Sequence, residues 1–215
     1  IVLTVTEERG SEAARICARC LLCDKMGAVS AVAADIITTG QFEEMELPRT
    51  CEWELHNGTV CSVTFPGYNH TLVQRRLARL LEDLIINAPV AGLVFVELPY
   101  RTGDKNDHRA DVAVITSCQH VNDVRNDRLE GSPKLVVEVL SRSNTSYRVE
   151  ELQSICFEHG CEELWQVNLR TKSVHVLRAD QEFGPERSYT VGDSIPIRIL
   201  NVDAILAVDA IFTAE

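Results

Sequence analysis

The pattern of hydrophobic and polar residues in the first third of the chain predicts a short helix followed by two strands. Thr38 or Thr39 supplies an N-terminal cap for a helix that ends before Pro48. In residues 51–65 two alternating runs flank an Asn-Gly pair, which provides the positive φ angles of a tight turn. We therefore expect a β-hairpin there.

A helical period follows in residues 69–86, where leucines and a valine recur at the spacing of one helix face. We expect this helix to pack on a sheet. Its other face is expected to carry Gln74, Arg75, Arg76 and Arg79, which include the densest basic cluster of the protein. The three arginines are a candidate nucleic-acid-binding surface. A solvated helix face is the alternative interpretation of such a charge run.

The remaining pattern predicts strands framed by a second helix. That helix, Ser146 to His159, ends before Gly160, which suits a left-handed cap. The predicted strands are 93–99, 111–115 and 134–140, then a hairpin over 163–179, a short strand pair and the tail 202–212. Residues Thr116 to Pro133 are expected to form a polar loop. Together these elements indicate an α/β fold in which helices flank a mixed β-sheet, with an N-terminal β-hairpin.

Two acidic residues lie in apolar runs of this predicted sheet. Glu138 lies inside Leu135–Ser141, a run with the composition of a fully buried strand, and Asp111 opens the apolar run that precedes it. An isolated charge in an apolar interior costs several kcal/mol, so Glu138 needs a proton, a partner or a cation. Two acids on two core strands predict a site for a hard cation.

Composition limits the classes of protein that the chain can belong to. The sequence has 215 residues, 45% of them hydrophobic and 25% charged, which fits one globular domain with a core. No stretch approaches the roughly 18 apolar residues of a membrane span, and the start lacks signal-peptide features, so we expect a soluble, cytoplasmic protein without a membrane partner. The net charge of −11 means that any affinity for nucleic acid must come from a local basic patch or a bound metal.

Residues 1–30 are expected to form an N-terminal extension, helical from about Ser11 to Met26. Cys17, Cys20 and Cys23 in this segment have a spacing that can begin an iron–sulfur or zinc site, but a fourth ligand at a standard spacing is missing. Small apolar residues on one helix face are the favoured interpretation. Four later cysteines are expected as core residues: Cys61, Cys118, Cys156 and Cys161.

The order of several sequence blocks resembles a known family. The blocks are ITTGQFEEME, WELHNGTV, GYNHTLVQRRL, RADVAVI, SPKLVVEVLS, GCEELWQVN and VDAIF. With their spacings, they resemble the Uma-two family of restriction-endonuclease-like proteins, within the PD-(D/E)XK nuclease superfamily. The resemblance covers Ile36 to Phe212, and it implies a restriction endonuclease-like domain over residues 31–215 with a central mixed sheet flanked by helices.

The resemblance also implies an activity and the residues that perform it. Family members are expected to hydrolyse DNA phosphodiester bonds with Mg²⁺ or Mn²⁺ held by strand carboxylates. By position, Asp111 and Glu138 match the catalytic acids that hold the metal, although Ala110 replaces the family's proline. Glu54 and His70 match further catalytic positions, where each is expected to complete the metal shell or orient the attacking water. A homodimer is expected by analogy, because cutting both strands requires two sites.

The chain departs from the family pattern at the superfamily lysine. That position is Leu140, and the following helix contains no lysine. Arg148 is the remaining cation there, and arginine does not readily exchange a proton near neutral pH. Lys134 lies about 13 Å from Glu138 along the same strand, too far to replace the lysine. Two hypotheses follow: a metal-dependent DNA endonuclease, or an inactive nuclease-like fold that binds nucleic acid or protein, with Glu138 paired to Arg109.

Overall fold

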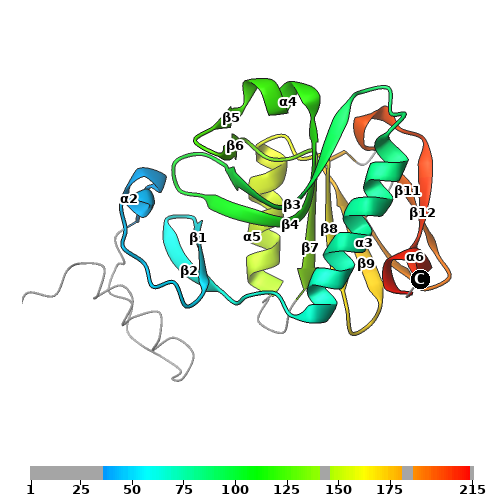
Figure 1. Cartoon of the computed structure of the whole chain (residues 1–215), viewed down its shortest axis with the longest axis horizontal. Coiled ribbons are helices and arrows are strands. Elements are labelled where there is room, and N and C mark those ends of the chain that lie inside the picture. The colour runs from blue at the N-terminus through cyan, green and yellow to red at the C-terminus, as the bar shows by residue number, and fades with distance from the viewer. Residues whose placement is uncertain (1–35, 141–145, 181–185, 214–215) are drawn as a thin grey trace, which may run out of the picture. The chain divides into compact units, whose positions relative to one another are not determined.

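The computed structural model describes residues 36–140, 146–180 and 186–213 (Figure 1). The predicted N-terminal extension, its helix and its three cysteines lie outside these residues. The described chain forms two compact units. The first unit contains residues 36–65 and 104–106, and the second contains residues 66–103 and the described residues from 107 onward.

The first unit contains a short helix and a hairpin. Its elements are α2 (Thr39–Glu43), β1 (Glu52–His56) and β2 (Thr59–Val63). Thr38 caps α2 in a capping box with Gln41, as the cap prediction required. The predicted hairpin is also confirmed, because β1 and β2 pair antiparallel around Asn57 and Gly58, which both have positive φ.

The second unit contains the remaining helices and strands. Its helices are α3 (Tyr68–Ile85), α4 (Ser117–Asn122), α5 (Ser146–Glu158), the 3₁₀ turn η2 (Ile199–Asn201) and α6 (Val208–Phe212). Its strands are β3 (Gly92–Arg101), β4 (Asp107–Thr116), β5 (Val124–Arg125), β6 (Arg128–Glu130), β7 (Leu135–Leu140), β8 (Glu163–Asn168), β9 (Ser173–Arg178), β10 (Arg187–Thr190), β11 (Ser194–Ile197) and β12 (Ala204–Ala207). No helix in the described part of the chain is long and apolar enough to cross a membrane.

A mixed sheet forms the centre of the second unit, in the order β10-β9-β8-β7-β4-β3-β6-β5. Most neighbouring strands are antiparallel, but β7 pairs parallel with β8 and β3 pairs parallel with β6. A parallel pair needs a crossover connection, and α5 lies in the connection between β7 and β8. The predicted α/β fold with a mixed sheet is therefore confirmed.

Two hydrophobic cores cover the two faces of this sheet. The α3 core contains Leu77 and Leu81 of α3, Val137 of β7 and Ile211 of α6. The α5 core contains Cys156 of α5 and, among others, Val136, which neighbours Val137 in β7. Since successive strand residues point to opposite faces, α3 and α5 lie on opposite faces of the sheet (Figure 1).

Three predictions about local structure are wrong. The segment from Thr116 to Pro133 is not a simple polar loop, because it contains α4, β5 and β6. β5 and β6 have two and three residues, so an alternating pattern in them is too short to be distinguished from a polar loop. The two strands of the predicted short pair, β10 and β11, form but do not pair with each other, since β10 pairs with β9 and β11 pairs with β12. Of the four cysteines expected in the core, Cys156 and Cys161 are buried, whereas Cys61 is half-buried and Cys118 is exposed.

The inward and outward alternation of side chains is interrupted at paired positions of β3 and β4. In each strand, two residues three apart pack on the α5 core: Phe95 and Leu98 in β3, Ala110 and Ala113 in β4. Between them, Glu97 adopts a φ of +56°, which is rare for any residue but glycine. The ladder pairs on both sides of Glu97 keep the same register, so the two strands shift together. Strict alternation would place Glu97 and Asp111 on the α5 face of the sheet. Because of the shift, both lie on the α3 face instead.

Candidate functional site

The carboxylate of Asp111 lies among three hydrogen-bond donors in the second unit. Oδ1 is 2.8 Å from Nε2 of His70 and accepts a second bond from Nε2 of Gln74, also at 2.8 Å. Oδ2 accepts from the backbone N–H of Val139 at 2.6 Å. Because an ionised carboxylate only accepts hydrogen bonds, His70 donates its Nε2–H to Asp111. The structure therefore brings two of the predicted catalytic residues, His70 and Asp111, together.

Asp111 lies where β4 and β7 stop pairing. The ladder between these strands ends at the pair Val112–Val137, so Asp111 and Glu138 are the next residues on each strand. The Asp111 side chain there accepts the hydrogen bond of Val139 N–H, in the place of a main-chain carbonyl. This position fixes the carboxylate against the backbone of β7. The side chains of Asp111 and His70 are each 15% exposed, so water and small ions have limited access.

Glu97 is a further acidic residue of this cluster that the sequence interpretation missed. Its Oε1 accepts a 2.5 Å hydrogen bond from the same Gln74 amide that binds Asp111. Burial raises the pKa of Glu97 above its ordinary value of 4.5, and the charge of Asp111 adds to this effect. The Gln74 hydrogen bond and the charges of Arg109 and His70 lower it. The signal that drew attention to Glu138, an acid within an apolar strand, is present for Glu97 too.

Glu138 faces the other side of the sheet. Its neighbours Val137 and Val139 pack in the α3 core and Val136 packs in the α5 core, so alternation turns Glu138 toward α5. The negative charge of Glu138 contributes, after burial, to raising the pKa of the Cys156 thiol of α5 to about 11. Glu138 is half-buried. Asp111 and Glu138 are thus neighbours across the ladder, and Asp111 is bound from α3 while Glu138 faces α5.

The prediction that Gln74 lies on the solvated face of α3 is wrong. Gln74 is 1% exposed and shares the sheet-facing side of the helix with His70, four residues earlier. Arg75 and Arg79, also four residues apart, share an exposed face, and Arg76 is half-buried. The arginine cluster therefore exists as a surface feature of α3, on a side of the helix different from the one that binds Asp111.

Glu54 lies in the first unit, on β1. Its Oε2 is 2.7 Å from Nε2 of His56, two residues along the same strand face. The side chain of Glu54 is 16% exposed and that of His56 is 8% exposed. Carboxylate and imidazole are both common metal ligands, so this pair offers two potential ligands within the first unit.

Comparison with known proteins assigns the chain to a family. The model of the Uma2 family, described as "Putative restriction endonuclease", matches residues 39–209. The chain belongs to the Uma2 family. The resemblance read from the sequence blocks is therefore confirmed. A search of curated proteins found no match.

A solved structure has the same fold as this Uma2 protein. It is described as a "putative nuclease belonging to DUF820 from Anabaena variabilis ATCC 29413", and it superposes with a TM-score of 0.68. The two sequences are 18% identical, and the match covers 82% of this chain and 97% of the other. At that identity the similarity shows the fold alone, which is restriction endonuclease-like. Family and fold together support a nuclease function.

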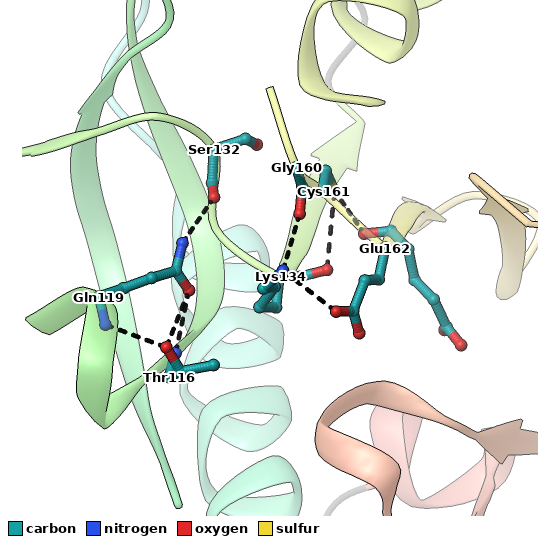
Figure 2. A network of polar contacts seen from close by, with 8 residues as sticks. Thr116, Gln119, Ser132, Lys134, Gly160, Cys161 and Glu162 are labelled. Carbon is teal, nitrogen blue, oxygen red and sulfur yellow. Dashed lines mark hydrogen bonds and ion pairs between the residues drawn. The ribbon is translucent and has the colours of Figure 1, made fainter. Parts of the chain in front are cut away.

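Lys134 of this Uma2 protein is held at the far end of β7, away from Glu138. Its Nζ donates to the carbonyl of Gly160 at 3.3 Å and lies 3.2 Å from a carboxylate oxygen of Glu162 (Figure 2). Nearby, Thr116 caps α4 in a capping box with Gln119, whose side-chain amide donates to the carbonyl of Ser132 (Figure 2). Lys134 thus joins β7 to the segment that follows α5. That Lys134 does not replace the superfamily lysine, and that Leu140 takes its place, stays a prediction from the family resemblance.

Proposed function

We propose that this protein is a metal-dependent endonuclease that hydrolyses DNA phosphodiester bonds with Mg²⁺ or Mn²⁺. The observation that carries the proposal is the pair of carboxylates, Asp111 and Glu97, that share one amide donor at the point where β4 and β7 diverge. Two like charges in a partly buried site repel each other, and a divalent cation would relieve that repulsion. The fold and the family of the chain are those of nucleases.

The donor chemistry of the site fits a hard cation. Mg²⁺ and Mn²⁺ prefer oxygen ligands, and the carboxylates of Asp111, Glu97 and Glu138 come from three neighbouring strands of one sheet. We assign the metal to Asp111 and Glu97, which share the α3 face of the sheet, and we propose that Glu138 joins them by turning around the end of the ladder, since it is the residue next to Asp111 there. When bound, such an ion polarises the phosphate and lowers the pKa of a coordinated water.

The protein's own residues orient this site. His70 donates through Nε2–H to Asp111, which turns the Nδ1 edge of the imidazole away from that carboxylate. We propose that this edge orients the attacking water. Arg109 is exposed, and its charge acts on Glu97, which makes it the candidate to stabilise negative charge on the phosphate in place of the missing lysine. Arg75, Arg76 and Arg79 are proposed to contact the DNA backbone.

The remaining assignments are predictions from family resemblance. The assisting role of Glu54 is tested by Glu54→Ala in the cleavage assay. Homodimerisation is tested by analytical ultracentrifugation.

An inactive nuclease-like fold that binds nucleic acid or protein is the second candidate function. Two points support it: the family resemblance places Leu140 at the lysine position, and Lys134 is bound to Glu162 and Gly160. Without a lysine at the site, the developing charge of the reaction has one fewer stabilising group.

The deciding experiment is cleavage of supercoiled plasmid with Mg²⁺ or Mn²⁺ by the wild-type chain, Asp111→Ala and Glu138→Ala. We expect both variants to lose about 100-fold or more in rate, at the upper end of the losses seen for residues around a metal. Glu162→Ala is the matched control, since its carboxylate pairs with Lys134 instead. Folding of every variant is checked by circular dichroism. If the wild type neither cleaves nor binds metal in calorimetry, the inactive fold is the better description.

A further inference from the structure

Gln74 makes an unusual pair of contacts for a buried amide. Its side chain is almost fully enclosed, with 1% of the residue exposed, and it lies on the sheet-facing side of α3. Its Nε2 donates both to Oε1 of Glu97 and to Oδ1 of Asp111. An amide NH₂ group has two hydrogens, so these two carboxylates use the whole donor capacity of the nitrogen.

The hydrogen bonds of Asp111 leave one direction for a cation. A carboxylate has about four lone-pair sites, two on each oxygen. Within the described residues, Oδ1 accepts from His70 and Gln74, and Oδ2 accepts from the backbone of Val139. Both sites of Oδ1 are therefore occupied, and one site remains on Oδ2. A cation that binds Asp111 without breaking these bonds would bind through Oδ2 alone.

Gln74 also bridges two groups that would otherwise move apart. The charge of Asp111 raises the pKa of Glu97, which is the sign of repulsion between the two carboxylates. Glu97 reaches this position through a left-handed backbone conformation, which costs free energy in a non-glycine residue. A neutral donor that binds both oxygens offsets the repulsion and adds no charge of its own.

We propose that Gln74 is a positioning residue, which holds Asp111 so that a single Oδ2 lone pair is presented to the metal. The inference rests on the proposed function, because it assumes a cation at Asp111. Partners that orient a ligand in this way typically change metal affinity by 10–100-fold when they are removed. A residue with a merely structural role would change stability and leave the affinity unchanged.

The test is calorimetric titration of the metal-free protein with Mn²⁺. Gln74→Met keeps much of the buried volume but removes both donated hydrogen bonds, and we expect it to weaken Mn²⁺ binding by about 10-fold or more. Gln74→His keeps a ring N–H at similar reach, and we expect it to retain most of the affinity. If Gln74→Met does not fold, Gln74→Asn replaces it, since its amide is one methylene short of both carboxylates.

Two controls separate positioning from packing. Leu81→Ala removes a fully buried side chain from the same face of α3 two turns later, and we expect lower thermal stability with unchanged Mn²⁺ affinity. Asp111→Ala identifies the binding signal that belongs to this site, because that signal should disappear.

The possible outcomes distinguish the inference from the proposed function. Wild-type binding that is weakened in Gln74→Met and retained in Gln74→His and Leu81→Ala supports both. Wild-type binding that depends on Asp111 and is equally strong in Gln74→Met overturns the role of Gln74 and leaves the proposed function in place. A wild type that binds no Mn²⁺ at Asp111 overturns both.

Discussion

Glu163 is buried and Glu97 is half-buried in the same sheet, and burial raises the pKa of each. Glu163 accepts from the indole N–H of Trp165 at 2.8 Å and lies 3.2 Å from Nε of Arg178, whose side chain is 2% exposed. Glu97 accepts from the neutral Gln74 and lies close enough to Asp111 for the two charges to repel. One carboxylate is paired with a buried arginine, whereas the other lies beside a second carboxylate whose repulsion Arg109 and His70 offset in part.

This difference separates a structural acid from one that we propose to be functional. A buried acid that is paired with a buried base holds two strands together, here β8 and β9, and gains nothing from an external ion. A buried acid beside a second acid is destabilised until a proton or a cation arrives. Burial alone therefore does not identify a site, whereas the sign of the neighbouring charge does.

The largest effect is predicted for Glu163, the structural acid of this comparison. Glu163→Ala leaves the guanidinium of Arg178 buried without its carboxylate, so we expect a loss of about 3–5 kcal/mol in the free energy of unfolding. Urea denaturation followed by tryptophan fluorescence measures it. Glu162→Ala, at the adjacent residue and 44% exposed, is the control with an expected loss below about 1 kcal/mol. Equal losses in the two variants would contradict the structural role of Glu163.

An intermediate effect of opposite sign is predicted on the functional side. The pKa of Glu97 is raised in the folded protein. Between the unfolded and the folded pKa, the folded chain therefore keeps a proton on Glu97 that the unfolded chain has released. Stability therefore falls as pH rises from the unfolded value of 4.5 through the higher folded pKa. Glu97→Gln removes this loss, and we expect the metal-free variant to be more stable than wild type at pH 8 by about 1 kcal/mol, a value that allows for solvent screening of a half-buried group.

Unfolding free energies of wild type and Glu97→Gln between pH 4 and pH 8 test this prediction. The difference should shrink toward zero near pH 4, where Glu97 is mostly protonated in both the folded and the unfolded chain. A variant that is less stable than wild type at pH 8 would show that Glu97 is neutralised within the chain, as Glu163 is.

The smallest effect is predicted for Lys134, whose ion pair with Glu162 is partly exposed. Its side chain is 28% exposed, so Lys134→Ala should cost about 0.2–1 kcal/mol of stability. Because Lys134 is held at the opposite end of β7 from Glu138, we expect an unchanged rate of plasmid cleavage. A rate that falls 100-fold in a folded Lys134→Ala protein would assign the catalytic lysine to this position.

Much of the fold was predictable because its signals are local. The capping box at Thr38, the Asn57-Gly58 hairpin and the helix that became Tyr68–Ile85 each depend on residues within a few positions of one another. Acids within apolar runs drew attention to Asp111, and the same rule applied to β3 would have selected Glu97. The misassigned face of Gln74 shows the limit of helical spacing, since a polar residue beside an apolar stripe is ordinarily solvated.

The sequence by itself determined the kinds and order of the main elements, the restriction endonuclease-like fold and the positions of the acids along their strands. Only the tertiary structure decided which polar groups meet. Gln74 joins Glu97, 23 residues away, to Asp111, 37 residues away, and this requires the joint shift of β3 and β4 at Glu97. The periodicity of a sequence indicates the face of the sheet on which a side chain lies, provided that the strand is regular. An irregularity shared by two paired strands moves a side chain to the other face, and the sequence pattern does not reveal it.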